Sequence, residues 1–154
     1  MTNHWVTIAS PTREAMVNPL LAACDAGYVP EAVTVVSNPS AANSVEAILP
    51  FYEDVFDAYD VDGATSVREV SDETAYDELA DTYREVVDVP AGDSVAVDIT
   101  PGRKFMSAIA FQAGLLEGVD HVYYLLLASD AHYGRLYQNI PRTAVDLVDF
   151  TEVI

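Results

Sequence analysis

The chain has 154 residues, and a hydrophobic content of 51% excludes an intrinsically disordered protein and is enough to build a buried core. The formal net charge is −18 and the pI is near 4.1, so carboxylates dominate the surface, as in proteins adapted to a very salty cytoplasm. Only seven residues are basic and Lys104 is the single lysine, so the rare positive charges say more about ligands than the acidic ones. We expect residues 1–154 to form one domain without a linker.

The sequence also indicates a cellular compartment. Cys24 is the only cysteine and cannot form an internal disulfide, which favours a buried thiol in a reducing environment. The first ten residues lack the basic and apolar regions of a signal peptide, and no apolar run is long enough to cross a membrane. We therefore expect a soluble, cytoplasmic protein with no membrane partner.

The first part of the chain predicts three strand–helix units. Apolar and β-branched runs predict strands, stripes at helical spacing predict helices, and the third strand alternates as an edge strand does. Pro50 predicts a kink or break in the second helix, and the polar residues 71–74 predict a helix cap. The predicted strands are 5–9, 32–36 and 66–70, and the predicted helices are 14–27, 41–59 and 73–87.

The stretch 94–118 is the centre of the prediction. It has a short β-branched run, a break at Pro101-Gly102, and a long apolar helix with Arg103 and Lys104 in its first turn. Two cations at the positive end of a helix dipole are unfavourable unless an anion is held there. The hydroxyls of Thr100 and Ser107 would help to bind that anion, and the alternative is two solvated basic side chains.

The last part of the chain completes the sheet. Residues 121–128 predict a fifth, strongly apolar strand, 129–141 a long loop, and 143–150 a strand with no crossover helix before it, hence antiparallel. The fold class is therefore α/β, a Rossmann-like three-layer sandwich with a mostly parallel sheet. The expected strand order is 3-2-1-4-5 plus a terminal antiparallel strand.

This strand order predicts where a ligand binds. A crevice opens at the carboxyl ends of strands one and four, where the chain reverses direction. The loops that meet there are 10–13 and 100–104, and they carry Arg13, Arg103 and Lys104; Arg135 follows strand five. A positively charged spot is therefore expected on an otherwise acidic molecule.

Several chemistries lack their sequence signatures. Neither GxGxxG after the first strand nor GxxxxGK[ST] occurs, which excludes the usual dinucleotide and NTPase phosphate cradles. A zinc site is poorly supported by one cysteine and three dispersed histidines, and Ser10 lies in ASPT rather than in GxSxG. Tyr133 and Tyr137 lie in the predicted loop 129–141, called the late loop below, and are candidates for stacking on bases.

The sequence DITPGRKFMSAIAF resembles the hallmark of the CARF domain, the CRISPR-associated Rossmann fold, at the turn after its fourth strand. The similarity extends to the hydroxyl-bearing ASPT loop, the order of units, the strand HVYYLLL and the closing strand. Pro101 departs from the family, which often has glycine there, and the proline removes one N–H donor. No effector domain follows, so we expect a stand-alone domain.

This resemblance implies a homodimer that binds cyclic oligoadenylate across its two-fold axis, without a cofactor or metal and without direct DNA binding. It further implies a ring nuclease that cleaves cyclic tetra-adenylate by attack of a ribose 2′-hydroxyl, with Ser10 and Lys104 as catalytic residues. Two alternatives stay open: a non-catalytic sensor, sponge or regulatory module, and an unrelated phosphate-ligand protein of similar fold. The expected ligand-binding residues are Ser10, Thr12, Arg13, Thr100, Gly102, Arg103, Lys104 and Arg135.

Overall fold

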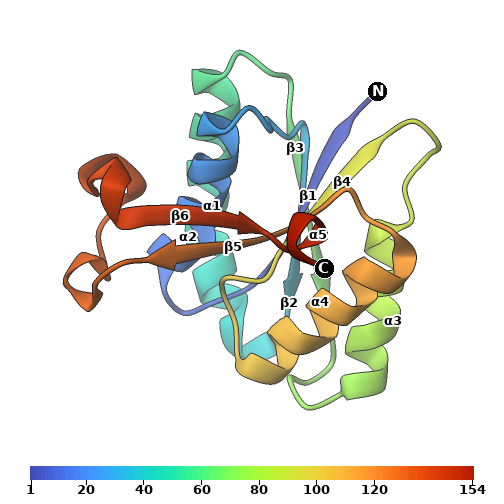
Figure 1. Cartoon of the computed structure of the whole chain (residues 1–154). Helices are drawn as coiled ribbons and strands as arrows, with labels where there is room; N and C mark the ends of the chain where they lie inside the picture. Colours follow the sequence, from blue (N-terminus) through green and yellow to red (C-terminus); the bar gives the residue numbers. More distant parts are fainter.

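A computed structural model describes all residues, 1–154, and shows one six-stranded sheet with helices on both faces (Figure 1). The strands are β1 (Asn3–Ile8), β2 (Ala32–Ser37), β3 (Ala64–Glu69), β4 (Ser94–Asp98), β5 (His121–Leu127) and β6 (Val145–Asp149). The helices are α1 (Arg13–Asp25), α2 (Ala42–Ala58), α3 (Tyr76–Val87), α4 (Lys104–Glu117) and the short α5 (Phe150–Val153). The predicted α/β class is confirmed.

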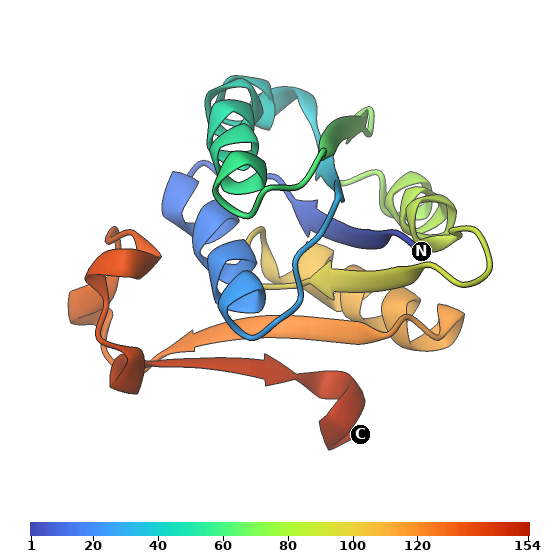
Figure 2. The same cartoon turned by 90° about the horizontal axis from the view of Figure 1, so that it is seen from above.

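The strand order is β3-β2-β1-β4-β5-β6. The first five strands pair in parallel, and β6 runs antiparallel to β5, from Tyr123 opposite Asp149 to Leu127 opposite Val145. Figure 2 shows β1, β4, β5 and β6 side by side, with the segment between β5 and β6 at one end of the sheet. The predicted order, the β3 edge and the antiparallel closing strand are all confirmed.

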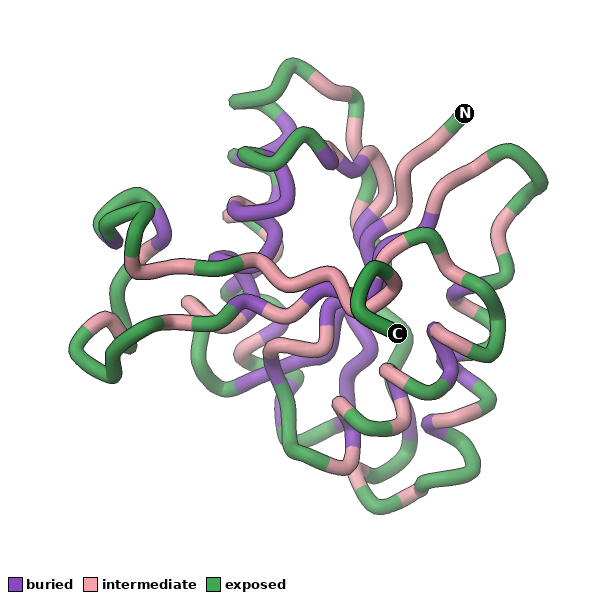
Figure 3. Tube along the Cα trace, viewed as in Figure 1, coloured by how far each residue is buried: buried purple, intermediate pink, exposed green.

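Two hydrophobic clusters hold the three layers together. One packs α1 and α2 on one face of the sheet and includes the fully buried Trp5 and Leu20. The other packs α3 and α4 on the opposite face and includes Ile8, Leu79 and Met106. Buried residues concentrate along the central strands in Figure 3, because parallel strands with helices on both faces have no side in water.

Two details differ from the sequence prediction. Of the predicted kink or break at Pro50, the break is wrong: α2 continues from Ala42 to Ala58 with the exposed Pro50 inside it, because packing of its buried face outweighs one lost hydrogen bond. The helix cap at 71–74 is also wrong, since α3 begins later, at Tyr76, and has no side-chain cap. Asp72 instead accepts the N–H and hydroxyl of Thr74 and forms a local turn.

The segment between β5 and β6 is a long connection, as expected, with three short 3₁₀ turns at Asp130–His132, Tyr137–Asn139 and Arg142–Ala144. Asn18 of α1 anchors it by donating to the carbonyl of Arg135 at 2.8 Å and accepting the N–H of Tyr137 at 2.8 Å. No helix in the structure is both long and apolar enough to cross a membrane.

Candidate functional site

The turn after β4 is the best-anchored feature at the carboxyl end of the sheet. The Thr100 N–H donates to Asp98 Oδ1 at 2.9 Å, and the Thr100 hydroxyl accepts the N–H of Leu125 in β5 at 2.9 Å. Gly102 has φ +86°, and a Cβ there would lie 2.9 Å from Cγ2 of Ile8 in β1. The turn is thus fixed to three neighbouring strands, and glycine is required at its tip.

Asp98 lies directly beneath this turn and is fully buried. Its Oδ2 accepts the hydroxyl of Thr7 at 2.9 Å, while Oδ1 accepts the Thr100 N–H. Burial raises the pKa of Asp98 to about 7, although these hydrogen bonds oppose the rise. Sequence analysis missed this residue as a site component, although a carboxylate that ends an apolar strand (VAVD) was a visible signal.

Four hollows lie at the turn or beside the Ser10 loop, and each takes its name from one of its residues. The serine hollow, of about 360 Å³, is lined by Ala9, Ser10, Pro11, Asn38, Ser40, Ala41, Glu73, Gly102, Arg103 and Met106. The lysine hollow, of about 430 Å³, is lined by Ile99, Thr100, Gly102, Lys104, Ser107, Ala108, Phe111 and Tyr124. The arginine hollow, of about 570 Å³, is lined by Pro11, Thr12, Arg13, Glu14, Asn43, Ser44 and Ala47.

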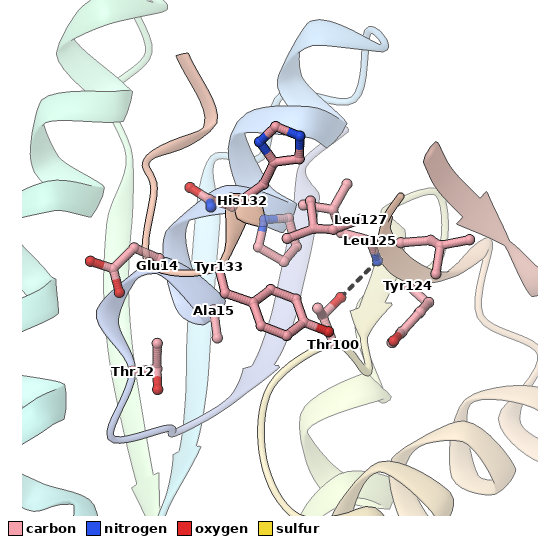
Figure 4. Close-up of a pocket in the computed structure, with 13 residues that line it drawn as sticks. Thr12, Glu14, Ala15, Thr100, Tyr124, Leu125, Leu127, His132 and Tyr133 are labelled. Carbon is pink, nitrogen blue, oxygen red and sulfur yellow. Dashed lines mark hydrogen bonds between the residues drawn. The ribbon is translucent and has the colours of Figure 1, made fainter. Parts of the chain in front are cut away.

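The fourth, the tyrosine hollow, has about 360 Å³ and lies between α1, the end of β5 and the late loop (Figure 4). It is lined by Thr12, Glu14, Ala15, Asn18, Pro19, Thr100, Tyr124, Leu125, Leu126, Leu127, His132, Tyr133 and Gly134. It shares Thr100 and Tyr124 with the lysine hollow. Three of these hollows therefore share residues of one turn, while the arginine hollow shares none and is joined to the serine hollow through Pro11.

In the serine hollow, Ser10 is 6% exposed and its hydroxyl accepts the N–H of Thr12 at 3.1 Å. Arg103 is the N-cap residue of α4, one position before the predicted first turn, and its Nε lies 3.3 Å from a carboxylate oxygen of Glu73. This ion pair joins the loop before α3 to the start of α4. Arg103, one of the expected anion-binding residues, is therefore already paired with a carboxylate of the protein itself.

In the lysine hollow, Lys104 opens α4 and takes part in none of the ion pairs of the structure. The Ser107 hydroxyl donates to the carbonyl of Pro101 at 3.2 Å, so it stabilises the turn. Gly102 lies between the two hollows and lines both. Ser10 and Lys104, the expected catalytic pair, thus line different hollows on either side of Gly102.

Arg13 and Arg135, the other two cations expected at the site, lie outside the turn after β4. The Arg13 guanidinium lies over the ring of Phe51, 4.9 Å from its centroid, and 3.8 Å from Glu14, in the arginine hollow. Arg135 is exposed in the late loop and lines none of the four hollows. The structure therefore gathers Ser10, Thr100, Gly102, Arg103 and Lys104 around the turn, with Thr12 and Arg13 beside it and Arg135 apart.

The two candidate stacking tyrosines have different environments. Tyr137 is buried, donates to Asp25 at 2.9 Å, and has the Arg142 guanidinium 3.8 Å from its ring centroid, so it belongs to the packing of the late loop. Tyr133 is 67% exposed and lines the tyrosine hollow. Only Tyr133 offers a free ring face to a ligand.

The histidines are dispersed, as the sequence indicates. His4 pairs with Asp93 at 3.0 Å and His121 with Asp149 at 2.7 Å, both at the amino ends of their strands, away from the turn. His132 lies in the late loop. No group of three or more His, Cys, Asp or Glu side chains is arranged to hold a metal ion.

Comparisons with known proteins inform the fold. A scan against protein-family models finds no match, and a search of curated proteins finds none. Among solved structures, the crystal structure of protein VC1899 from Vibrio cholerae is similar, with a TM-score of 0.61 and 14% sequence identity over 79% of this chain. The chain spans 30% of that protein's length, and at this identity the likeness shows the Rossmann-like fold alone.

Proposed function

We propose that the protein binds cyclic oligoadenylate, with cyclic tetra-adenylate as the expected ring, at a site shared by two protomers, and that it acts as a metal-independent ring nuclease in antiviral signalling. The observation that carries the proposal is the rigid turn at the switch point between β1 and β4, which holds Gly102, Arg103 and Lys104 beside the Ser10 loop. Ligands of open α/β sheets bind at this place. The resemblance of the turn sequence to the CARF hallmark supplies the ligand class.

The chemistry of the turn supports an anionic ligand. Lys104 has no carboxylate partner, whereas Arg103 and Arg13 both lie near one, so Lys104 is the cation free to meet a phosphate. A compact ammonium on a flexible stem can follow a phosphate oxygen as charge develops during cleavage. In this proposal Lys104 stabilises that charge and Ser10 orients the scissile group.

A second candidate, binding without turnover, is favoured by one observation. Ser10 and Lys104 line separate hollows, and the Ser10 hydroxyl already accepts the Thr12 N–H. Cleavage within one protomer would need both groups at one phosphate, so catalysis would depend on a ligand that bridges both hollows. A sensor or sponge needs no such convergence.

The acidic surface fits a cytoplasm of high salt, where a charge of −18 is screened. The test therefore uses pure protein in high-salt buffer with a metal chelator and with cyclic tri-, tetra- and hexa-adenylate, followed by chromatography of the products. Turnover of the tetra-adenylate to linear products supports the nuclease. Binding of intact ligand supports the sensor, and the absence of binding to all three rings rules out both.

A further inference from the structure

The turn after β4 lies directly above a buried acidic group. Asp98 ends β4 with no exposed surface, and its Oδ1 accepts the N–H of Thr100 in the turn at 2.9 Å. Thr100 also lines the lysine and tyrosine hollows and is bonded to β5 through Leu125 (Figure 4). A ligand in contact with Thr100 is therefore linked to the carboxyl group through this one residue. An ionised Asp98 would repel an anion held there.

No cation offsets the charge of Asp98. None of the ion pairs of the structure includes it, and a carboxylate without a cation is unfavourable in a dry core. Its Oδ2 accepts the hydroxyl of Thr7 in β1 at 2.9 Å. Burial raises the pKa of Asp98 to about 7, so both protonation states are accessible near neutral pH.

The other titratable groups around Asp98 stay neutral in this range. Tyr52 of α2 and Tyr83 of α3 interact with its charge, and Tyr123 lies opposite it in β5; burial raises the pKa of all three. The charged residues at the near ends of the flanking helices make no hydrogen bond or ion pair with Asp98. These residues are Arg13 and Glu14 of α1, Glu46 of α2, Asp77 and Glu78 of α3, and Lys104 of α4. Asp98 is therefore the group of this cluster whose charge changes near neutral pH.

The Thr7 hydroxyl suits both protonation states of Asp98. When Asp98 is ionised, Thr7 donates to Oδ2. When Oδ2 has bound a proton from solvent, the carboxyl O–H donates to Thr7 Oγ1 instead, because a hydroxyl can donate or accept. Oδ1 continues to accept the Thr100 N–H. Protonation therefore removes the negative charge beneath the turn without breaking the bond that anchors the turn.

We propose that Asp98 makes the anion affinity of the turn dependent on pH, because its carboxyl group takes up one proton from solvent when an anion binds at Thr100 and Lys104. Asp98 acts through the turn and does not touch the ligand. By linkage, the anion binds more tightly to the protonated protein, so affinity falls as pH rises through the range in which Asp98 ionises. This inference rests on the proposed function, because it needs an anionic ligand at the turn.

The first test follows the ionisation of Asp98 in protein labelled with carbon-13. Its carboxyl carbon signal, assigned by comparison with Asp98→Asn, should titrate near neutral pH. Saturating cyclic tetra-adenylate should raise the midpoint by about one pH unit, which corresponds to a tenfold coupling. A midpoint near the ordinary value of an aspartate, or one that the bound ligand does not move, would overturn the inference.

The second test counts protons by calorimetry of cyclic tetra-adenylate in buffers of different ionisation enthalpy. Affinity should fall about tenfold between pH 6 and pH 9, with proton uptake near pH 8, although the phosphodiesters and adenines of the ligand do not titrate in this range. Asp98→Asn should bind with an affinity independent of pH and without proton uptake. Asp146→Asn, at an exposed position on β6, should behave as the unaltered protein. Equal pH dependence of the two variants would contradict the coupling.

The two proposals can fail separately. Binding of cyclic tetra-adenylate with the same affinity at all pH values would remove the inference and leave the proposed function. If no cyclic oligoadenylate binds at any pH, the proposed function falls, and sulfate, whose charge is constant over this range, becomes the probe. A sulfate-induced shift of the Gly102 amide signal that is larger at pH 6 than at pH 9, and equal at both in Asp98→Asn, supports the inference. Equal shifts in the unaltered protein, or none, overturn it.

Discussion

At the scale of single residues, Asp98 has the most unusual environment in the protein. It is a fully buried carboxyl group, it has no cation beside it, and its hydrogen-bond donors are the Thr7 hydroxyl and the Thr100 N–H. Tyr52 from α2 and Tyr83 from α3 are the titratable groups that face it, and Asp98 in turn helps to raise the pKa of both. Asp98 therefore couples the core to the turn above it.

The buried carboxyl group predicts a pH dependence of stability. Burial raises the pKa of Asp98 from 3.8 to about 7, so the folded protein favours the protonated form and stability falls as pH rises between these values. Asp98→Asn keeps an acceptor for the Thr100 N–H and removes the charge. We expect it to raise the free energy of unfolding by about 2–4 kcal/mol at pH 8 and to have little effect near pH 4.

Chemical denaturation at several pH values measures this difference. Asp146→Asn, the same change at an exposed carboxylate on β6, is the control and should give a small effect at every pH. A destabilised Asp98→Asn at pH 8 would mean that the ionised carboxylate contributes more to holding the turn than its burial costs.

Lys104 and Arg13 form a second pair of matched residues. Lys104 lies in the lysine hollow without an ion pair, whereas Arg13 is held over Phe51 and near Glu14. We expect Lys104→Ala to reduce the single-turnover rate of cyclic tetra-adenylate cleavage by two or more orders of magnitude, as loss of a transition-state contact does. Arg13→Ala should reduce it much less, and equal losses would make Lys104 a binding residue only.

At the scale of elements, the turn between β4 and α4 determines the geometry of the site. Its tip at Gly102 combines a left-handed φ of +86° with a close approach to Ile8. Gly92 has a similar φ of +94° but open space around it, so it is a matched control for backbone strain. Alanine substitutions at the two glycines therefore separate the free-energy cost of a left-handed φ from the cost of a close contact.

Gly102→Ala should therefore destabilise the protein by about 2–3 kcal/mol, and Gly92→Ala by about 1 kcal/mol, since only the first also displaces Ile8. Thermal unfolding of both variants measures the difference. Ligand affinity should fall in Gly102→Ala alone, because the turn moves relative to Lys104. Equal effects of the two variants would show that β1 yields to the added methyl group.

The sequence predicted the elements better than it predicted the site. Strand order followed from alternating strand and helix patterns, because right-handed crossovers leave few arrangements. A break at Pro50 was wrongly allowed because local propensity cannot weigh the packing of α2 against one lost hydrogen bond. The separation of Ser10 from Lys104 depends on side-chain directions at a turn, which no pattern of residue types encodes. The burial of Asp98 was signalled by its place at the end of an apolar strand, and sequence analysis passed over it.

At the scale of the whole molecule, the exposed surface of α4 is relevant to the expected homodimer. Its outer stripe, Lys104, Ala108, Gln112 and Leu116, is exposed, and Leu116 is 73% exposed. Phe111 on the same helix is only partly covered, by an edge contact with Phe150 of α5 at 5.4 Å between ring centroids. The homodimer that the family resemblance implies stays a prediction, and this helix is a candidate for its interface.

We expect a dimer in high salt that Leu116→Asp weakens at least tenfold, because a carboxylate on each protomer would be buried in the interface. Val67→Asp adds the same charge at an exposed site on the opposite edge strand β3 and should leave association unchanged. Sedimentation velocity over a range of concentrations measures both. A monomer of 16.7 kDa at all concentrations would remove the two-fold ligand site.

The charge of the whole molecule predicts how ligand affinity responds to salt. At about 1 M ionic strength the Debye length is near 3 Å, so long-range attraction between a few cations and a phosphate is almost fully screened, and so is repulsion from the −18 surface. Only groups in contact with the ligand then hold it. These are the hydroxyls and N–H groups of the Ser10 loop and the Gly102 turn, together with Lys104.

Affinity for cyclic tetra-adenylate should therefore hold or improve as salt rises, whereas a basic patch loses affinity steeply through counterion release. Titration of the ligand at several salt concentrations in which the protein stays folded separates the two behaviours, and a steep loss would mean that the ligand is held by diffuse charge rather than in the hollows around the turn.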